Sequence, residues 1–254
     1  MRLILIRHGQ TPSNVVGALD TAFPGAPLTA LGEAQAAALP AALAHEPIVG
    51  IHASPLLRTQ LTAAPLGAAR SLSVQVVPGL EEITAGALEM RADAVARQEY
   101  AACLVGWMHG DLDRSLPGGV DGHGFLQRFD AAIGRLAGSY RDQNTVAVVA
   151  HGAAIRVYTA LRTGMHGDRA AQLDIRNTGA AVLDGSPTAG WHLERWHPEP
   201  LGGLRLADHS ATDATGESAE RVAEESGSRR RAGGAASVAG DGTVGLPMDL
   251  RKRH

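Results

Sequence analysis

Residues 145–150, with the sequence Thr-Val-Ala-Val-Val-Ala, constrain the fold more than any other part of the chain. This run is rich in β-branched residues and apolar on both faces, which is typical of a strand that is buried on both sides. Such a strand belongs in a parallel sheet that helices cover on both faces. Residues 3–6, all leucine or isoleucine, form a second short run of this kind, and it ends at Arg7.

Helical and strand patterns alternate along the rest of the chain. The predicted strands are residues 3–6, 48–53, 74–77 and 145–150, followed by closing strands at 173–177, 180–183 and 191–196. The predicted helices are residues 29–44, 56–69, 91–108, 124–140 and 153–161, with Thr29 as the N-cap of the first. This alternation predicts an α/β fold, a three-layer α/β/α sandwich around a mainly parallel central sheet.

The composition changes near residue 199. Beyond that point Gly, Ser, Ala and charges of both signs dominate, and apolar residues are sparse. A segment of this composition buries too little apolar surface to offset the entropy lost on ordering. We therefore expect one domain over residues 1–198 and a disordered tail over residues 199–254.

Charge and cysteine content exclude several classes of protein. The formal net charge of −3 over 254 residues gives no basic face for nucleic acid. Cys103 is the single cysteine, so no disulfide can form within the chain, and a reducing, cytoplasmic location is expected. The apolar run at the N-terminus is too short for a secretion signal, and no run is long enough to span a membrane.

Three polar segments lie either just after a strand or at the start of a helix. Their positions predict a common site. Arg7-His8-Gly9 follows the first strand, and His151-Gly152 follows the strand at 145–150. Functional groups of open α/β sheets lie just beyond the carboxyl ends of the strands, so both histidines are expected at one crevice. A glycine after each histidine lets the backbone approach a ligand closely.

Arg58 adds a third element, in the first turns of the helix that follows the second strand. Guanidinium groups bind oxyanions through planar, paired donors, so two arginines and two histidines suit a phosphoryl group. A metal site is not expected, because His8 and His151 lack a third ligand and a nearby carboxylate pair. We predict neither a metal nor an organic cofactor.

Together these segments resemble the histidine phosphatase superfamily, which includes the phosphoglycerate mutases. The matching residues are Arg7-His8-Gly9-Gln10-Thr11-x-x-Asn14, Pro27-Leu28-Thr29-x-x-Gly32-x-x-Gln35-Ala36, Ser54-Pro55-Leu56-Leu57-Arg58-Thr59, Leu80-x-Glu82-x-x-x-Gly86 and His151-Gly152. The resemblance extends from residue 1 to about residue 196.

The resemblance implies a role for each matching residue. His8 would attack phosphorus and form a phosphoenzyme, with its second ring nitrogen held by a backbone carbonyl. The phosphoryl oxygens would be bound by Arg7, Asn14, Arg58, His151 and Gly152. Glu82 would protonate the leaving oxygen and then activate water, with the adjacent Glu81 as the alternative acid.

The implied activity is hydrolysis of a small phosphorylated metabolite through a phosphohistidine. Between Met90 and Pro117 the chain has only scattered basic residues (Arg91, Arg97 and Arg114), which favours a phosphatase over a phosphoglycerate mutase. Two alternatives stay open, a cofactor-dependent phosphoglycerate mutase and a weakly catalytic phosphate-binding scaffold. The expected partner is the substrate, with a homodimer possible and neither nucleic acid nor membrane expected.

Overall fold

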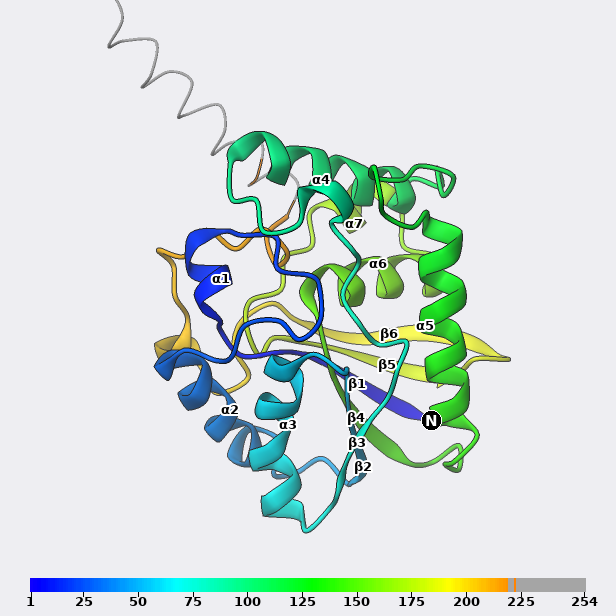
Figure 1. Ribbon diagram of the computed structural model, residues 1–254. Coiled ribbons are helices and arrows are strands. Elements are labelled where there is room, and N and C mark those ends of the chain that lie inside the picture. The colour runs from blue at the N-terminus through cyan, green and yellow to red at the C-terminus, as the bar shows by residue number, and fades with distance from the viewer. Residues whose placement is uncertain (219–221, 223–254) are drawn as a thin grey trace, which may run out of the picture.

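The computed structural model describes residues 1–218 and 222 of the chain. Its centre is a six-stranded sheet with the strand order β3-β2-β4-β1-β5-β6 (Figure 1). The strands are β1 (Arg2–Arg7), β2 (Ile48–Ala53), β3 (Val74–Val76), β4 (Thr145–Ala150), β5 (Ala180–Ser186) and β6 (Gly190–His197). The first four are parallel, whereas β5 pairs antiparallel with β1 and β6 antiparallel with β5.

Helices cover both faces of the sheet. The longer ones are α2 (Ala30–Ala42), α3 (Leu57–Arg70), α4 (Ala94–Met108), α5 (Gly122–Ala137) and α6 (Gly152–Arg162). Shorter helical segments are α1 (Pro12–Val16), η1 (Gly86–Leu88), α7 (Gly167–Ala171) and η2 (Leu204–Leu206). None of the described helices is long and apolar enough to cross a membrane.

Alternate residues of β1 divide the core into two layers. Ile4 and Ile6 pack with Leu39 of α2 and Leu66 of α3. Leu3 and Leu5 face the opposite layer, built by α4, α5 and α6. Because successive side chains of a strand point to opposite faces, an all-aliphatic strand serves both layers at once. The predicted three-layer α/β/α sandwich with a mainly parallel sheet is confirmed.

Most of the predicted elements are present with ends shifted by a few residues, but the strand expected at residues 173–177 is wrong. Ile175 and Arg176 each donate one backbone hydrogen bond, to Gly216 and Pro198 respectively, and no ladder forms. Asn177 begins a turn and turns its side chain towards the carbonyl oxygen of His8. The segment instead supports the loops around it.

The prediction of a disordered tail from residue 199 is wrong for residues 199–218. These residues, orange in Figure 1, run beside α1 and α2. The N–H of Thr212 donates to the carbonyl of Val15 at 3.4 Å, and Gln10 donates to Asp208 at 2.8 Å. Polar contacts hold this segment against the domain, so its low apolar content gave no sign that it is ordered. The rest of the expected tail, 219–221 and 223–254, lies outside the described residues.

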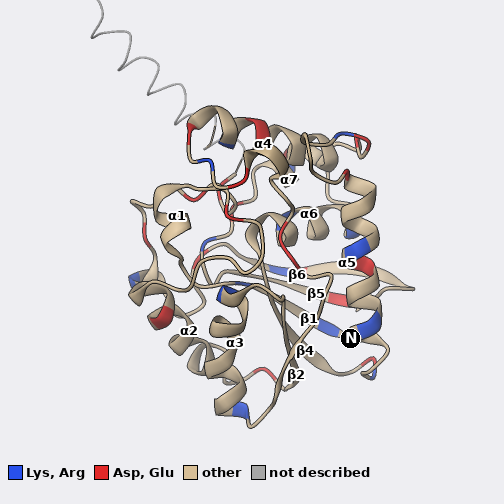
Figure 2. Cartoon of the chain, in the orientation of Figure 1, with Lys and Arg blue, Asp and Glu red and all other residues tan. Residues whose placement is uncertain are grey.

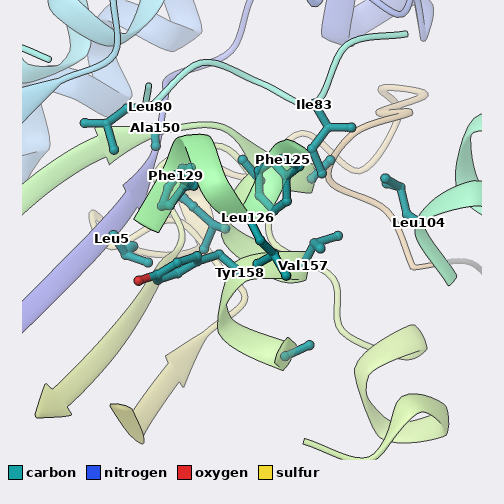
Figure 3. Packing of buried hydrophobic residues seen from close by; sticks show 14 of the residues in the cluster. Leu5, Leu80, Ile83, Leu104, Phe125, Leu126, Phe129, Ala150, Val157 and Tyr158 are labelled. Carbon is teal, nitrogen blue, oxygen red and sulfur yellow. The ribbon is translucent and has the colours of Figure 1, made fainter. Parts of the chain in front are cut away.

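An aromatic cluster anchors α5 and α6 to each other. The rings of Phe129 and Tyr158 are 4.6 Å apart between centroids, and those of Phe125 and Phe129 are 5.6 Å apart (Figure 3). Phe129 is fully buried.

Replacing Phe129 with alanine is expected to lower the free energy of unfolding by about 3–5 kcal/mol, because it leaves a cavity in a close-packed layer. Phe23→Ala is the matched control, since Phe23 is 74% exposed, and a change of at most about 0.5 kcal/mol is expected. Urea denaturation of both variants measures the difference. Equal effects would contradict the assignment of Phe129 to the core.

Candidate active site

The pairing of β1 with β4 brings the two predicted histidines together. Arg7 lies opposite Ala150 in the parallel register, and the N–H of His8 donates to the carbonyl of Ala150 at 3.0 Å. His8 and His151 are the next residues of the two strands. Their ring centroids are 5.4 Å apart, and both side chains are buried.

His8 is held in one tautomer. Its Nδ1 lies 2.8 Å from the carbonyl oxygen of Gly9. A carbonyl can only accept, so Nδ1 carries the proton and Nε2 keeps its lone pair. Burial lowers the pKa of His8 well below its ordinary value, and the positive charges of Arg58 and Arg7 lower it further. His8 is therefore neutral at pH 7, as a nucleophile must be.

His151 occupies the N-cap position of α6, and its Nε2 lies 2.8 Å from Ser54 Oγ. Its Nδ1 is buried and has no hydrogen-bond partner. Burial lowers the pKa of His151 well below its ordinary value, followed in size by the charge of Arg58. Ser54 belongs to one of the motif segments, but its contact with His151 was not predicted.

Arg58 lies in the first turn of α3 and points to the same site. Its Nη2 donates to the carbonyl oxygen of Asp20 at 2.9 Å, and its Nη1 lies 3.6 Å from the Asp20 carboxylate. That distance is too long for a hydrogen bond, so Nη1 is a buried donor without a partner. Asp20 was not among the predicted residues.

The loop that carries Asp20 is itself fixed from two sides. Asp20 accepts hydrogen bonds from Ser13 Oγ at 2.8 Å and from the N–H of Ala26 at 3.0 Å. The carboxylate of Glu89 accepts the N–H groups of Thr21 at 2.8 Å and Ala22 at 3.0 Å. Glu89 therefore supports Arg58 indirectly, a role that no sequence motif indicated.

Of the two candidate acids, Glu82 lies at the site and Glu81 does not. Glu82 is buried, and its carboxylate accepts the N–H groups of Ala153 at 3.1 Å and Ala154 at 2.8 Å, in the first turn of α6. Burial raises the pKa of Glu82, and these backbone hydrogen bonds oppose the rise. Glu81 instead pairs with Arg128 at 2.9 Å and is about one-third exposed.

Arg7 and Asn14 are present but engaged differently from the prediction. The two terminal nitrogens of Arg7 are hydrogen-bonded to Asp213, Thr215 and the carbonyl of Ile175. Asn14 donates to the same Asp213 at 3.2 Å. Only Nε of Arg7 is buried without a partner. Arg7 therefore does not present a pair of free donors to a ligand, and the Asn14 amide is also engaged by Asp213.

Gly152 lies at the first position of α6, where the absence of a side chain has a steric reason. A Cβ at this position would lie 2.7 Å from the carbonyl oxygen of Thr215 and 2.8 Å from Arg7 Nε. Gly152, which was expected to let the backbone approach a ligand, thus leaves room for the backbone of residues 213–217.

Two further motif segments hold the loop after β1. A Cβ on Gly9 would lie 2.6 Å from the carbonyl oxygen of Gly32, so the loop after β1 and the first turn of α2 touch through their backbones. Gln35 Oε1 accepts the N–H of Gln10 at 2.8 Å, and its amide donates to Leu206 at 2.8 Å. These motif residues therefore fix the backbone on which His8 stands.

Charges elsewhere are mixed. Blue and red segments are spread over the outer helices and loops of the coloured chain in Figure 2, without a long run of one sign. Within the described residues, no group of three or more histidines, cysteines or carboxylates could hold a metal ion.

Comparison with known proteins agrees with the motif analysis. The model of the histidine phosphatase superfamily (branch 1) matches residues 3–198. The chain belongs to this superfamily. A PE-PGRS family protein of Mycobacterium tuberculosis is 36% identical over 216 residues, which cover 79% of this chain and 37% of that protein. The chain thus spans little more than a third of the length of that relative.

Two phosphatases are also similar to this member of the superfamily. Adenosylcobalamin/alpha-ribazole phosphatase of Escherichia coli is 36% identical over 166 residues, covering 65% of this chain and 80% of the enzyme. The solved structure of mycobacterial glucosyl-3-phosphoglycerate phosphatase has a TM-score of 0.67 at 25% identity, covering 78% of this chain and 99% of that one.

The lowered pKa values of His8 and His151 predict how stability depends on pH. The unfolded chain has ordinary histidines with a pKa near 6.5 and binds more protons than the folded chain below that pH. The contribution of these two histidines to stability should therefore be constant above about pH 6.5, and it should become unfavourable as the pH is lowered further.

His151→Asn is expected to make this loss of stability with falling pH shallower, as followed by urea midpoints from about pH 7.5 to about pH 5. His123→Asn, which changes an exposed histidine, serves as the control and should leave the slope unchanged. An identical slope in wild type and His151→Asn would contradict a buried, neutral His151.

Proposed function

We propose that the protein hydrolyses phosphate monoesters of small metabolites through a phosphohistidine at His8. The observation that carries the proposal is a set of buried nitrogens without partners beside the free Nε2 of His8. They are Arg7 Nε, Arg58 Nη1 and His151 Nδ1. Buried polar nitrogens without partners are costly, so an oxyanion that accepts from those that carry a hydrogen gains that free energy on binding.

The first chemical step transfers the phosphoryl group to the enzyme. His8 Nε2 attacks phosphorus as the ester P–O bond breaks, and the leaving oxygen takes a proton from Glu82. Arg58, Arg7 and His151 stabilise the charge on the phosphoryl oxygens. Burial of Glu82 supports this role, because its raised pKa favours the protonated form that a general acid needs.

The second step regenerates His8. Glu82, now a carboxylate, takes a proton from water as the oxygen attacks phosphorus and the N–P bond breaks. Inorganic phosphate is released, and both His8 and Glu82 return to their starting forms. The two half-reactions therefore need one acid and one nucleophile and no further reactant besides water.

The segment between Met90 and Pro117 supports a phosphatase rather than a mutase. Arg91 forms an exposed ion pair with Asp93 at 2.8 Å, and Arg97 is buried. One arginine of this segment is thus paired with a neighbouring carboxylate and another lies inside the fold, which is a sparse basic lining for the second anionic group of a reorienting intermediate. The names of the relatives point the same way, because alpha-ribazole phosphatase and glucosyl-3-phosphoglycerate phosphatase both act on phosphorylated metabolites.

His8→Ala is expected to abolish hydrolysis of p-nitrophenyl phosphate, because no other group supplies the nucleophile. Rapid quench of wild type should trap a base-stable, acid-labile phosphate on the protein, which the variant lacks. His45→Ala alters an exposed histidine and is the control. EDTA should leave turnover unchanged. Substantial turnover by His8→Ala would contradict the mechanism.

Glu82→Gln is expected to lower kcat by about 10²–10⁴-fold, the usual contribution of general acid–base catalysis. The loss should be larger for an alkyl phosphate than for p-nitrophenyl phosphate, because the alkoxide needs the proton more. Glu81→Gln is the neighbouring control and should change kcat by less than about twofold, since the Glu81 carboxylate pairs with Arg128 and accepts the N–H of Gly79.

The pH profile of kcat/KM gives a second test of Glu82. Activity should fall on the alkaline side as the acid loses its proton above its raised pKa, and on the acid side only well below the ordinary pKa of a histidine, where His8 becomes protonated. An alkaline limb that persists unchanged in Glu82→Gln would assign the acid to another residue.

A further inference from the structure

The guanidinium of Arg7 is almost saturated with hydrogen bonds before any substrate binds. Nη1 donates to the carbonyl of Ile175 at 2.8 Å and to the carboxylate of Asp213. Nη2 donates to the other oxygen of Asp213 at 2.6 Å and to Thr215 Oγ1 at 3.0 Å. A guanidinium has five N–H groups, and these contacts use the four terminal ones. The remaining N–H, on Nε, is buried without a partner.

Asp213 is itself held in place by its own turn. Its carbonyl accepts the N–H groups of Gly216 at 3.2 Å and Glu217 at 3.0 Å. The carbonyl of Gly216 in turn accepts the N–H of Ile175 at 2.8 Å. The turn is therefore attached to the same loop whose carbonyl binds Arg7, and Asn14 contributes a further hydrogen bond to the Asp213 carboxylate.

The packing around this turn leaves no room for a different arrangement. A Cβ on Gly216 would overlap Arg7 Nη1 and lie 2.6 Å from the carbonyl oxygen of Ile175. On the opposite side, Gly152 leaves room for the backbone of Thr215. The side chain of Arg7 is fully buried between them, and that of Asp213 is only 13% exposed.

We infer that Asp213 is a positioning residue for Arg7 and that Arg7 meets the phosphoryl group through Nε alone. The inference rests on the proposed function and extends it to a part of the chain that the superfamily match, which ends at residue 198, does not include. The carboxylate binds the edge formed by the two Nη groups and thereby fixes the direction of the Nε–H. It also balances a buried positive charge that would otherwise stand without a counter-ion.

The competing reading of the same contact is inhibition, in which the Asp213 carboxylate occupies the place of a substrate oxyanion. The two interpretations predict opposite effects on activity when the carboxylate is removed. A positioning residue helps turnover, so its removal lowers kcat. An inhibitory carboxylate competes with substrate, so its removal lowers KM or raises kcat/KM.

Asp213→Asn in the whole 254-residue chain is the decisive variant, because it keeps the shape of the side chain and one accepting oxygen while removing the charge. We expect kcat for p-nitrophenyl phosphate to fall by about 10- to 100-fold, the loss that a misplacement of about 1 Å produces, with a smaller change in KM. Thr215→Val, which removes one contact to Nη2, should shift kcat in the same direction by a smaller factor.

Glu199→Gln is the matched control. It removes a carboxylate of the same segment that pairs with a different arginine, Arg176, at 3.2 Å, and it should leave kcat within about twofold of wild type. Binding of inorganic phosphate by calorimetry provides a readout that does not depend on turnover, and it should weaken in Asp213→Asn but not in Glu199→Gln.

The outcomes separate this inference from the proposed function. Increased kcat/KM in Asp213→Asn would overturn positioning in favour of inhibition, and unchanged kcat and phosphate affinity would overturn it outright. A wild type that binds phosphate without hydrolysing esters would sink the proposed function alone, and phosphate affinity would still test Asp213. A wild type that neither binds nor hydrolyses would overturn both.

Discussion

The parallel register between β1 and β4 is the constraint on which the rest of the site depends. Because Arg7 lies opposite Ala150, the chain leaves both strands at the same level and places His8 beside His151. Both strands are buried on both faces, so a slip in register would exchange the side chains that the two close-packed layers receive. The distance between the two imidazoles is therefore set by the core, and it does not depend on the conformation of a flexible loop.

Burying two arginines beside these histidines creates an electrostatic problem that the surrounding segments resolve. Charges out of water are costly unless they are paired. Asp20 approaches Arg58 from the loop after α1, and Asp213 pairs with Arg7 from the segment after β6. The carbonyl of Asp20 accepts from Nη2 of Arg58 and the carboxylate of Asp213 accepts from both Nη groups of Arg7, so one nitrogen of each guanidinium is left unsatisfied, Nη1 of Arg58 and Nε of Arg7. The site consequently holds its cations in fixed directions while keeping donors available for an oxyanion.

Sequence reasoning recovered the features that depend on neighbouring residues and missed those that depend on distant ones. The strand before His8 was visible because an aliphatic run ending at a polar turn is a local pattern, and Thr29 was visible as an N-cap for the same reason. The contact of Asp213 with Arg7 joins residues 206 positions apart. It lies in a segment whose composition suggested disorder, because hydropathy registers apolar burial and not the hydrogen bonds that hold residues 199–218. The contributions of Asp20 and Glu89 to the site were not predicted for a related reason, since a single carboxylate in a loop belongs to no periodic pattern.

The start of α6 explains why Glu82 and His151 form a unit although they are far apart in sequence. His151 occupies the N-cap position of the helix, and Glu82 accepts the N–H groups of the second and third helical residues, Ala153 and Ala154. These N–H groups have no partners within the helix, and the helix dipole favours an anion at this end. The same contacts therefore satisfy the helix and locate the carboxyl group, while burial favours its protonated form. The proposed roles of Glu82, an acid in one step and a base in the next, depend on these opposed effects on its pKa.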